Sequence, residues 1–129
     1  MTLFTKIIKG EIPCHKLYED EDYFSFLDIK PLKPGHALVI PKVEVDYIFD
    51  LEDELLSGLL TVARPIARAI EQCVDCERIG LMVAGLEVPH THVHLVPISS
   101  VGDLNFAHAT ETPPGELADL AGKIRGVLG

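Results

Sequence analysis

Three histidines, His90, His92 and His94, occupy alternate positions in the segment 88–97. In an α-helix, with about 3.6 residues per turn, these side chains would fan over about 200° and could not act together. In a β-strand side chains alternate between faces, so all three histidines share one face. At about 3.3 Å per residue, neighbouring histidines are about 6.6 Å apart, which a phosphate-sized group can bridge. The pattern therefore predicts a strand over residues 90–96.

The rest of the chain alternates between helical and extended patterns separated by turns. Apolar residues recur at helical spacing from Leu51 to Ile70, and Asp50 in front of them is a good N-cap for a long helix. Pro65 lies inside that pattern and is expected to kink the helix or divide it in two. Shorter elements are expected at residues 3–9 (helix), 16–27 (hairpin around an acidic turn at 19–22), 36–40 and 79–83 (strands) and 117–128 (helix).

The order of these elements is helix, strands, helix, strands, helix, with short hairpin-like connections. That order predicts an α+β fold rather than a doubly wound parallel sheet. The expected architecture is an antiparallel β-sheet with one long central helix and short N- and C-terminal helices. No repeat, low-complexity segment or linker divides the chain, so residues 1–129 are expected to form a single domain.

Charge and cysteine usage narrow the classes of partner. The chain has 11 Lys and Arg against 20 Asp and Glu, a net charge of −9 with neutral histidines. Such a surface repels nucleic acid polymers and anionic membranes, so neither is expected as a partner. Cys73 and Cys76 form a lone Cys-x-x-Cys, which we interpret as two small apolar residues near a helix end. With no signal-peptide pattern and no run of about 18 apolar residues, we expect a cytoplasmic protein.

The histidine strand itself is open to three interpretations. It could be a polar strand face with incidental histidines, although burying three imidazoles costs free energy that a structural role seldom needs. It could be a metal site, with His36 or a carboxylate completing the ligands. It could also catalyse nucleophilic attack at phosphorus, for which neutral imidazole is suited near neutral pH.

The segment from Gly85 to Leu95 resembles the signature of the histidine triad (HIT) family, in which three histidines alternate with apolar residues. Residues 4–13 are similar to that family's opening, and residues 26–31 and 34–42 are similar to its nucleoside-binding stretch. The resemblance thus extends in order through most of the chain.

The resemblance implies an enzyme, a nucleotide hydrolase or transferase that acts on the α-phosphate of a purine nucleoside phosphoramidate or adenylated substrate. His92 would be the nucleophile and form a nucleotidyl-histidine intermediate, His94 would contact the phosphate, and His90 would hold the tautomer and orientation of the nucleophile. The nucleotide-binding residues implied are Phe26, Leu27, Asp28, Ile29, His36, Gly85, Glu87 and Val88. Among them Asp28 would bind the ribose hydroxyls, and backbone N–H groups around residues 85–88 would bind the phosphate.

Departures from the family pattern leave two alternatives open. Leu86 and Glu87 stand where many members have Gln and one branch has Ser. The chain could instead be a dinucleoside-polyphosphate hydrolase, or a nucleotide-binding sensor with little catalysis. Phe4, Lys6 and Glu44 do not supply the ligands of the family's zinc-bearing subset, so neither metal nor cofactor is expected. Members of this size are usually homodimers, so the resemblance implies a homodimer that uses the apolar face of the long helix.

Overall fold

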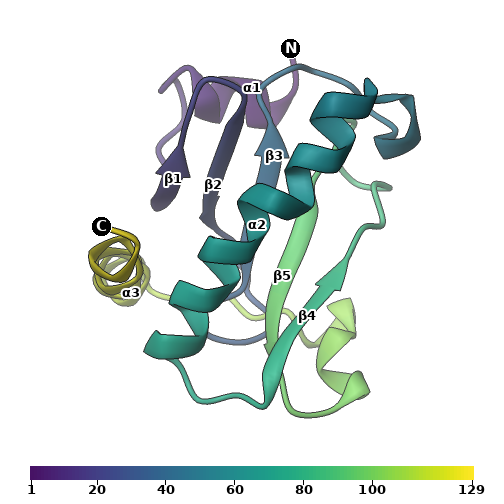
Figure 1. Cartoon of the computed structure of the whole chain (residues 1–129). Coiled ribbons are helices and arrows are strands. Elements are labelled where there is room, and N and C mark those ends of the chain that lie inside the picture. Colours follow the sequence, from purple (N-terminus) through teal and green to yellow (C-terminus); the bar gives the residue numbers. More distant parts are fainter.

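Five strands form one antiparallel sheet in the computed structural model, which describes residues 1–129. The sheet has the order β1-β2-β3-β5-β4, and every neighbouring pair is antiparallel (Figure 1). The strands are β1 (Lys16–Glu19), β2 (Tyr23–Leu27), β3 (Ala37–Pro41), β4 (Arg78–Met82) and β5 (Val93–Ile98). The α+β class and the antiparallel sheet predicted from the sequence are confirmed.

Helices cover both faces of the sheet. The long helix α2 (Asp53–Cys73) crosses one face, and α3 (Pro114–Leu128) packs beside α2 and against β1 (Figure 1). The short helix α1 (Leu3–Ile8) packs on the other face. Three 3-10 turns complete the chain: η1 (Ile48–Asp50), η2 (Val101–Leu104) and η3 (Phe106–His108). No helix combines the length and the apolar character that a membrane crossing requires.

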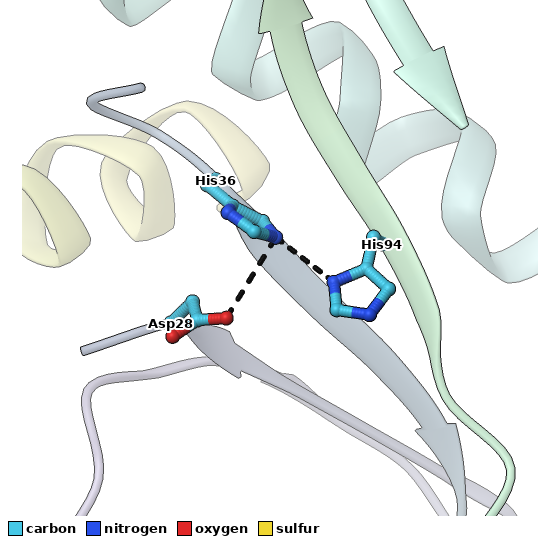
Figure 2. Close-up of side chains that lie close together, drawn as sticks. All are labelled: Asp28, His36 and His94. Carbon is cyan, nitrogen blue, oxygen red and sulfur yellow. Dashed lines mark hydrogen bonds and ion pairs between the residues drawn. The ribbon is translucent and has the colours of Figure 1, made fainter. Parts of the chain in front are cut away.

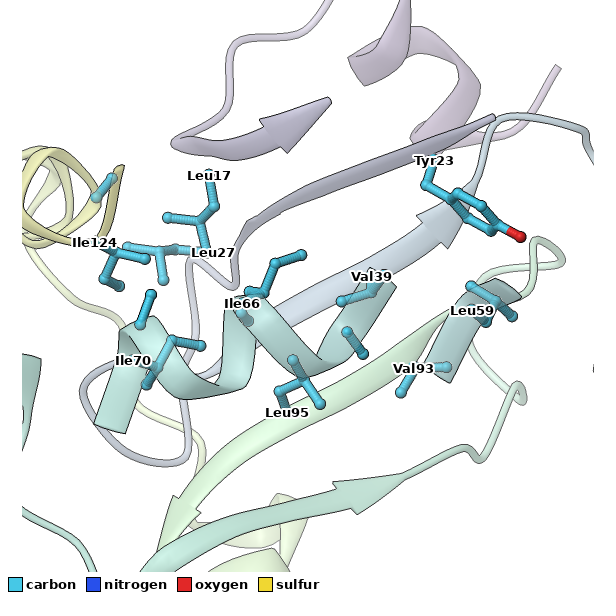
Figure 3. Close-up of a cluster of buried hydrophobic side chains, with 14 of the residues drawn as sticks. Leu17, Tyr23, Leu27, Val39, Leu59, Ile66, Ile70, Val93, Leu95 and Ile124 are labelled. Atoms are coloured by element: carbon cyan, nitrogen blue, oxygen red, sulfur yellow. The ribbon is translucent and has the colours of Figure 1, made fainter. Parts of the chain in front are cut away.

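Strand alternation sorts the buried side chains into two clusters. The larger cluster contains 16 buried residues between the sheet, α2 and α3, among them Val93 and Leu95 of β5 (Figure 3). The smaller cluster joins residues of β2 and β3 to Phe4 and Ile7 of α1. Because β5 points Val93 and Leu95 toward α2, His94 between them faces the side of α1.

The long helix differs in two ways from the sequence-based prediction. It begins at Asp53, with Glu52 at the N-cap position, and the predicted cap Asp50 instead ends the turn η1. The start is delayed because Leu51 is extended and its side chain is buried in the larger cluster. Pro65 does not divide the helix, since it lies on the exposed side, where water can bond the backbone carbonyl left without a donor.

The strand predicted over residues 90–96 begins later, at Val93. Thr91 does not pair with a neighbouring strand, because its N–H and its hydroxyl both donate to the backbone carbonyl of Val45, at 2.7 and 2.8 Å. This segment therefore pairs with the loop after β3 rather than with a strand. The alternation persists through it, since the ring of Phe4 packs edge-on against both His90 and His92.

Candidate active site

A cleft of about 470 Å³ opens on the α1 side of the sheet. Its walls are mostly apolar, and come from α1, the segment 12–14, the end of β2 and the turn η3. His92 and His94 lie in it together with Asp28, Lys30 and Glu87. The apolar lining residues are Leu3, Phe4, Ile7, Ile12, Pro13, Phe26, Leu27, Ile29, Leu38, Val88, Phe106 and Ala109.

His92 is held by a single interior hydrogen bond. Its Nδ1 lies 2.7 Å from the backbone carbonyl oxygen of His90. A carbonyl accepts but does not donate, so Nδ1 carries the proton of the neutral ring and Nε2 carries the lone pair. Nε2 of His92 has no hydrogen-bond partner within the chain. Because every fully buried side-chain nitrogen and oxygen does have a partner, Nε2 is not fully buried and opens onto the cleft.

His94 has the opposite tautomer, and His36 sets it. Nδ1 of His36 accepts the backbone N–H of Leu32 at 3.0 Å, so the proton of His36 is on Nε2. That Nε2–H donates to Nδ1 of His94 at 2.9 Å, and the proton of His94 is therefore on its own Nε2 (Figure 2). Two neighbouring rings, 5.0 Å apart, thus present a lone pair and an N–H to the cleft.

Burial keeps the rings of His94 and His36 neutral. Burial, together with the neighbouring His36 and His92, lowers the pKa of His94 to about 3. Burial also lowers the pKa of His36, although the carboxylate of Asp28, 3.7 Å away, acts in the opposite direction. His94 consequently acts as a neutral hydrogen-bond donor near pH 7, not as an imidazolium.

His90 lies behind the cleft and does not line it. Its Nε2–H donates to the carbonyl of Pro41 at 2.8 Å, and its Nδ1 lies 2.9 Å from the hydroxyl of Thr2. Burial lowers the pKa of His90 as well, so the ring stays neutral. The backbone carbonyl of His90, rather than its ring, contacts His92.

The remaining residues predicted from the sequence fall into three groups. Phe26, Leu27, Asp28, Ile29, Glu87 and Val88 line the cleft with His92 and His94. His36 stands behind His94, and Gly85 lies outside the lining, with a positive φ of 74°. One oxygen of Asp28 accepts the backbone N–H of Lys30 at 2.9 Å. The side chain of Asp28 is nevertheless partly exposed at the cleft.

Sequence reasoning missed several residues that shape the cleft. Phe106 of η3 packs against His94 with ring centroids 5.0 Å apart, and Leu32 fixes the tautomer of His36 through its backbone. Thr2 and Glu44 join α1 to the histidine segment. None of these residues belongs to a periodic pattern, so the sequence carried no signal for them.

One cluster has the composition of a metal site. Ligand atoms of Asp28, His36 and His94 lie within 4.8 Å of one another (Figure 2). Yet the nitrogen of His36 that faces the cluster carries a proton, because the other nitrogen accepts from Leu32. The two facing nitrogens are 2.9 Å apart, shorter than the roughly 3.3 Å expected for two ligands at about 2.0 Å from a tetrahedral zinc ion. The arrangement fits a hydrogen bond better than a shared metal ion.

This fold is shared with solved structures of one family. A HIT-like protein from Bartonella henselae, described as involved in cell-cycle regulation, matches 98% of this chain and 95% of its own with a TM-score of 0.85 and 33% identity. The family model for the HIT domain matches residues 9–101. The chain therefore belongs to the histidine triad family.

Two named proteins are similar in sequence to this chain over most of its length. The Bacillus subtilis protein named Protein hit is 38% identical over 133 residues, covering 95% of this chain and 90% of that protein. An adenosine 5′-monophosphoramidase of Saccharomyces cerevisiae is 40% identical over 96 residues, covering 74% of this chain and 61% of the yeast protein.

The buried neutral histidines predict a stability that falls on mild acidification. The pKa values of His36, His90 and His94 are lower in the folded chain than the ordinary value near 6.5, so below that value the unfolded chain binds more protons. The free energy of unfolding should therefore decrease from about pH 7.5 to about pH 5.5, as measured by urea denaturation. Each proton contributes a slope of up to about 1.4 kcal/mol per pH unit.

His94→Asn should reduce the slope of the unfolding free energy against pH by up to about 1.4 kcal/mol per pH unit, the contribution of one proton. The reason is that it removes a group that takes up a proton in this pH range only in the unfolded chain. His108→Asn is the matched control, since His108 is exposed. An unchanged slope in His94→Asn would contradict the assignment of His94 as a buried neutral ring.

Proposed function

We propose that this chain is a nucleotide hydrolase that acts on the α-phosphate of a purine nucleoside phosphoramidate or adenylated substrate. One observation carries the proposal: the bond from Nδ1–H of His92 to the carbonyl of His90 leaves the Nε2 lone pair facing the cleft. Neutral imidazole with a free lone pair is a nucleophile toward phosphorus. His94 supplies an N–H beside it for a phosphate oxygen.

The reaction takes place in two displacements. In the first, Nε2 of His92 forms a bond to phosphorus, the bond to the leaving nitrogen breaks with its electron pair, and that nitrogen takes a proton from water. In the second, a water oxygen forms a bond to phosphorus, the bond to His92 breaks, and the ring returns to its neutral form while water releases a proton. The sum consumes one water and yields a nucleoside monophosphate and an amine.

The cleft offers matching groups for the rest of a nucleotide. Asp28, at the end of β2, supplies a partly exposed carboxylate for the ribose hydroxyls. Apolar side chains such as Phe26 and Ile7 surround the space beside it, which favours a flat base bound by packing. The backbone N–H groups of Glu87 and Val88 make no hydrogen bond within the chain and are free for phosphate oxygens.

Trapping the intermediate tests this proposal. Mixing the protein with adenosine 5′-phosphoramidate and quenching in alkaline denaturant, which preserves phosphorus–nitrogen bonds, should give an intact mass increased by one adenylyl group. His92→Ala should show no increase, and its turnover should fall on the order of 10³-fold or more. His108→Ala, in an exposed turn, is the control. Wild-type turnover by His92→Ala would exclude His92 as the nucleophile.

The charges around the cleft favour phosphoramidates over dinucleoside polyphosphates. Lys30 is the one basic side chain in the lining, and its Nζ is 3.9 Å from Glu111. Asp28 and Glu87 are acidic, and His94 is neutral. A leaving group with several phosphates would therefore meet two carboxylates and a single lysine, which is shared with Glu111.

We expect kcat/KM to be at least about 10-fold higher on adenosine 5′-phosphoramidate than on a diadenosine polyphosphate, the scale of one unfavourable charge contact. Glu87→Lys should narrow this ratio by raising the rate on the polyphosphate. Glu21→Lys makes the same change of net charge in the exposed turn between β1 and β2 and should leave the ratio unchanged. Faster hydrolysis of the polyphosphate by the wild type would favour the alternative activity.

We also infer that a second copy of the chain covers the edge of the sheet at β4. This strand pairs on one side only, with β5. Leu81 of β4 and Leu60 of α2 are 47% and 57% exposed and line one shallow groove. An unpaired strand edge beside exposed leucines is a surface suited to self-association.

Light scattering coupled to size-exclusion chromatography should give twice the mass of the chain. Leu81→Glu should give the monomer mass because it places a charge in the proposed contact. Val101→Glu, at an 84% exposed position outside the groove, should remain dimeric. A monomeric wild type would refute the inference.

A further inference from the structure

We propose that Thr2 and Glu44 are positioning residues for His92, acting through His90. Thr2, Thr5, Glu44 and His90 form a hydrogen-bonded group that we call the N-terminal clasp. It joins three segments distant in sequence: the start of α1, the loop after β3 and the residues before β5. Its role in catalysis rests on the function proposed above.

The clasp begins at the carboxylate of Glu44. Oε1 of Glu44 accepts the backbone N–H of Thr2 at 2.6 Å and the hydroxyl of Thr5 at 2.7 Å. These two bonds lower the pKa of Glu44 to about 2, so the acceptor stays ionised at neutral pH. Glu44 thus holds the first turn of α1 at two points.

The directions of the remaining bonds follow from the donors available. Nε2 of His90 donates to the carbonyl of Pro41, so Nδ1 of His90 is an acceptor. The hydroxyl of Thr2 lies 2.9 Å from that Nδ1 and 3.2 Å from the hydroxyl oxygen of Thr5, and its single proton goes to Nδ1 because Nδ1 has no other donor. The oxygen of Thr2 accepts the N–H of Thr5 at 3.1 Å. The Pro41 carbonyl thus sets the tautomer of His90, and the Thr2 hydroxyl holds the ring in place at its other nitrogen.

His90 connects the clasp to His92 through its backbone carbonyl. Its backbone carbonyl accepts Nδ1–H of His92 and so keeps the Nε2 lone pair in the cleft. The same clasp holds α1, whose Phe4 packs against His92 with ring centroids 5.0 Å apart. Since α1 has six residues, it is too short to be stable alone and depends on such contacts.

The first test is spectroscopic and needs no substrate. Thr2→Val keeps the shape of the side chain but removes the hydroxyl that His90 accepts. The imidazole ¹⁵N shift of Nδ1 in His90 should then move to that of an acceptor without a donor, and the shifts of His92 should change with the position of the His90 carbonyl, whereas Thr2→Ser should keep the wild-type spectrum. Thr61→Val, on the exposed side of α2, is the matched control.

The second test measures the covalent step. In single turnover, Thr2→Val and Glu44→Ala should slow adenylylation of His92 about 10-fold, with a smaller change in KM, because positioning affects the attack more than binding. Thr2→Ser and Glu44→Gln, which keep the donor and the acceptor, should recover most of the rate.

The outcomes separate the clasp from the proposed function. If the wild type forms no adenylyl-His92, the proposed function fails, and the ¹⁵N measurement still decides whether the clasp orders the histidines. If folded Thr2→Val keeps both the wild-type ¹⁵N spectrum of His92 and the wild-type rate, the positioning role is overturned. Global unfolding of Thr2→Val would also overturn it, since the contact would then be a determinant of the fold.

Discussion

Desolvation of imidazole is the constraint on which the site depends. His36, His90, His92 and His94 are all buried, and a charged ring in that interior would lose most of its hydration. The rings of His36, His90 and His94 are therefore neutral, and a neutral ring has one donor and one acceptor nitrogen, which the surroundings must match. Carbonyls at Pro41 and His90 fix two rings, and the N–H of Leu32 fixes a third. The tautomers follow from this matching, and the chemistry follows from the tautomers.

The sheet makes this possible by dividing its side chains between two environments. One face supplies the larger apolar cluster under α2 and α3, which supports β3 and β5 from behind. The other face carries the histidines, so the reacting atoms project from a backbone that is packed on its far side. A net charge of −9 describes the surface of the chain, whereas the cleft contains the neutral ring of His94 and few charged side chains. Under the proposed function, recognition of a phosphate there would depend on oriented dipoles more than on net charge.

The local sequence pattern was sufficient to predict the regular helices and strands. It was insufficient where contacts between residues distant in sequence set the ends of these elements. The helices near residues 3–9 and 117–128 and the hairpin at 16–27 were predictable because period and burial agree there. Asp50 was wrongly predicted as the cap because burial of Leu51 outweighs cap preference. The strand start at His90 was wrong because Thr91 bonds the distant carbonyl of Val45. The histidines of the site were recognisable from spacing, but Thr2, Leu32 and Phe106 act through contacts that no local pattern encodes.

The separation of the two hydrophobic clusters has a consequence for motion. Helix α1 forms a wall of the cleft yet contributes only to the smaller cluster of 6 buried residues. Detaching it would expose that cluster while the 16-residue cluster stays closed, so the free energy of this local opening is well below that of global unfolding. Amide protons of α1 should accordingly exchange with solvent earlier than those of α2 and β5. The wall of the cleft is therefore expected to open before the larger cluster does, and under the proposed function this opening would give a bulky nucleotide a route in and its product a route out.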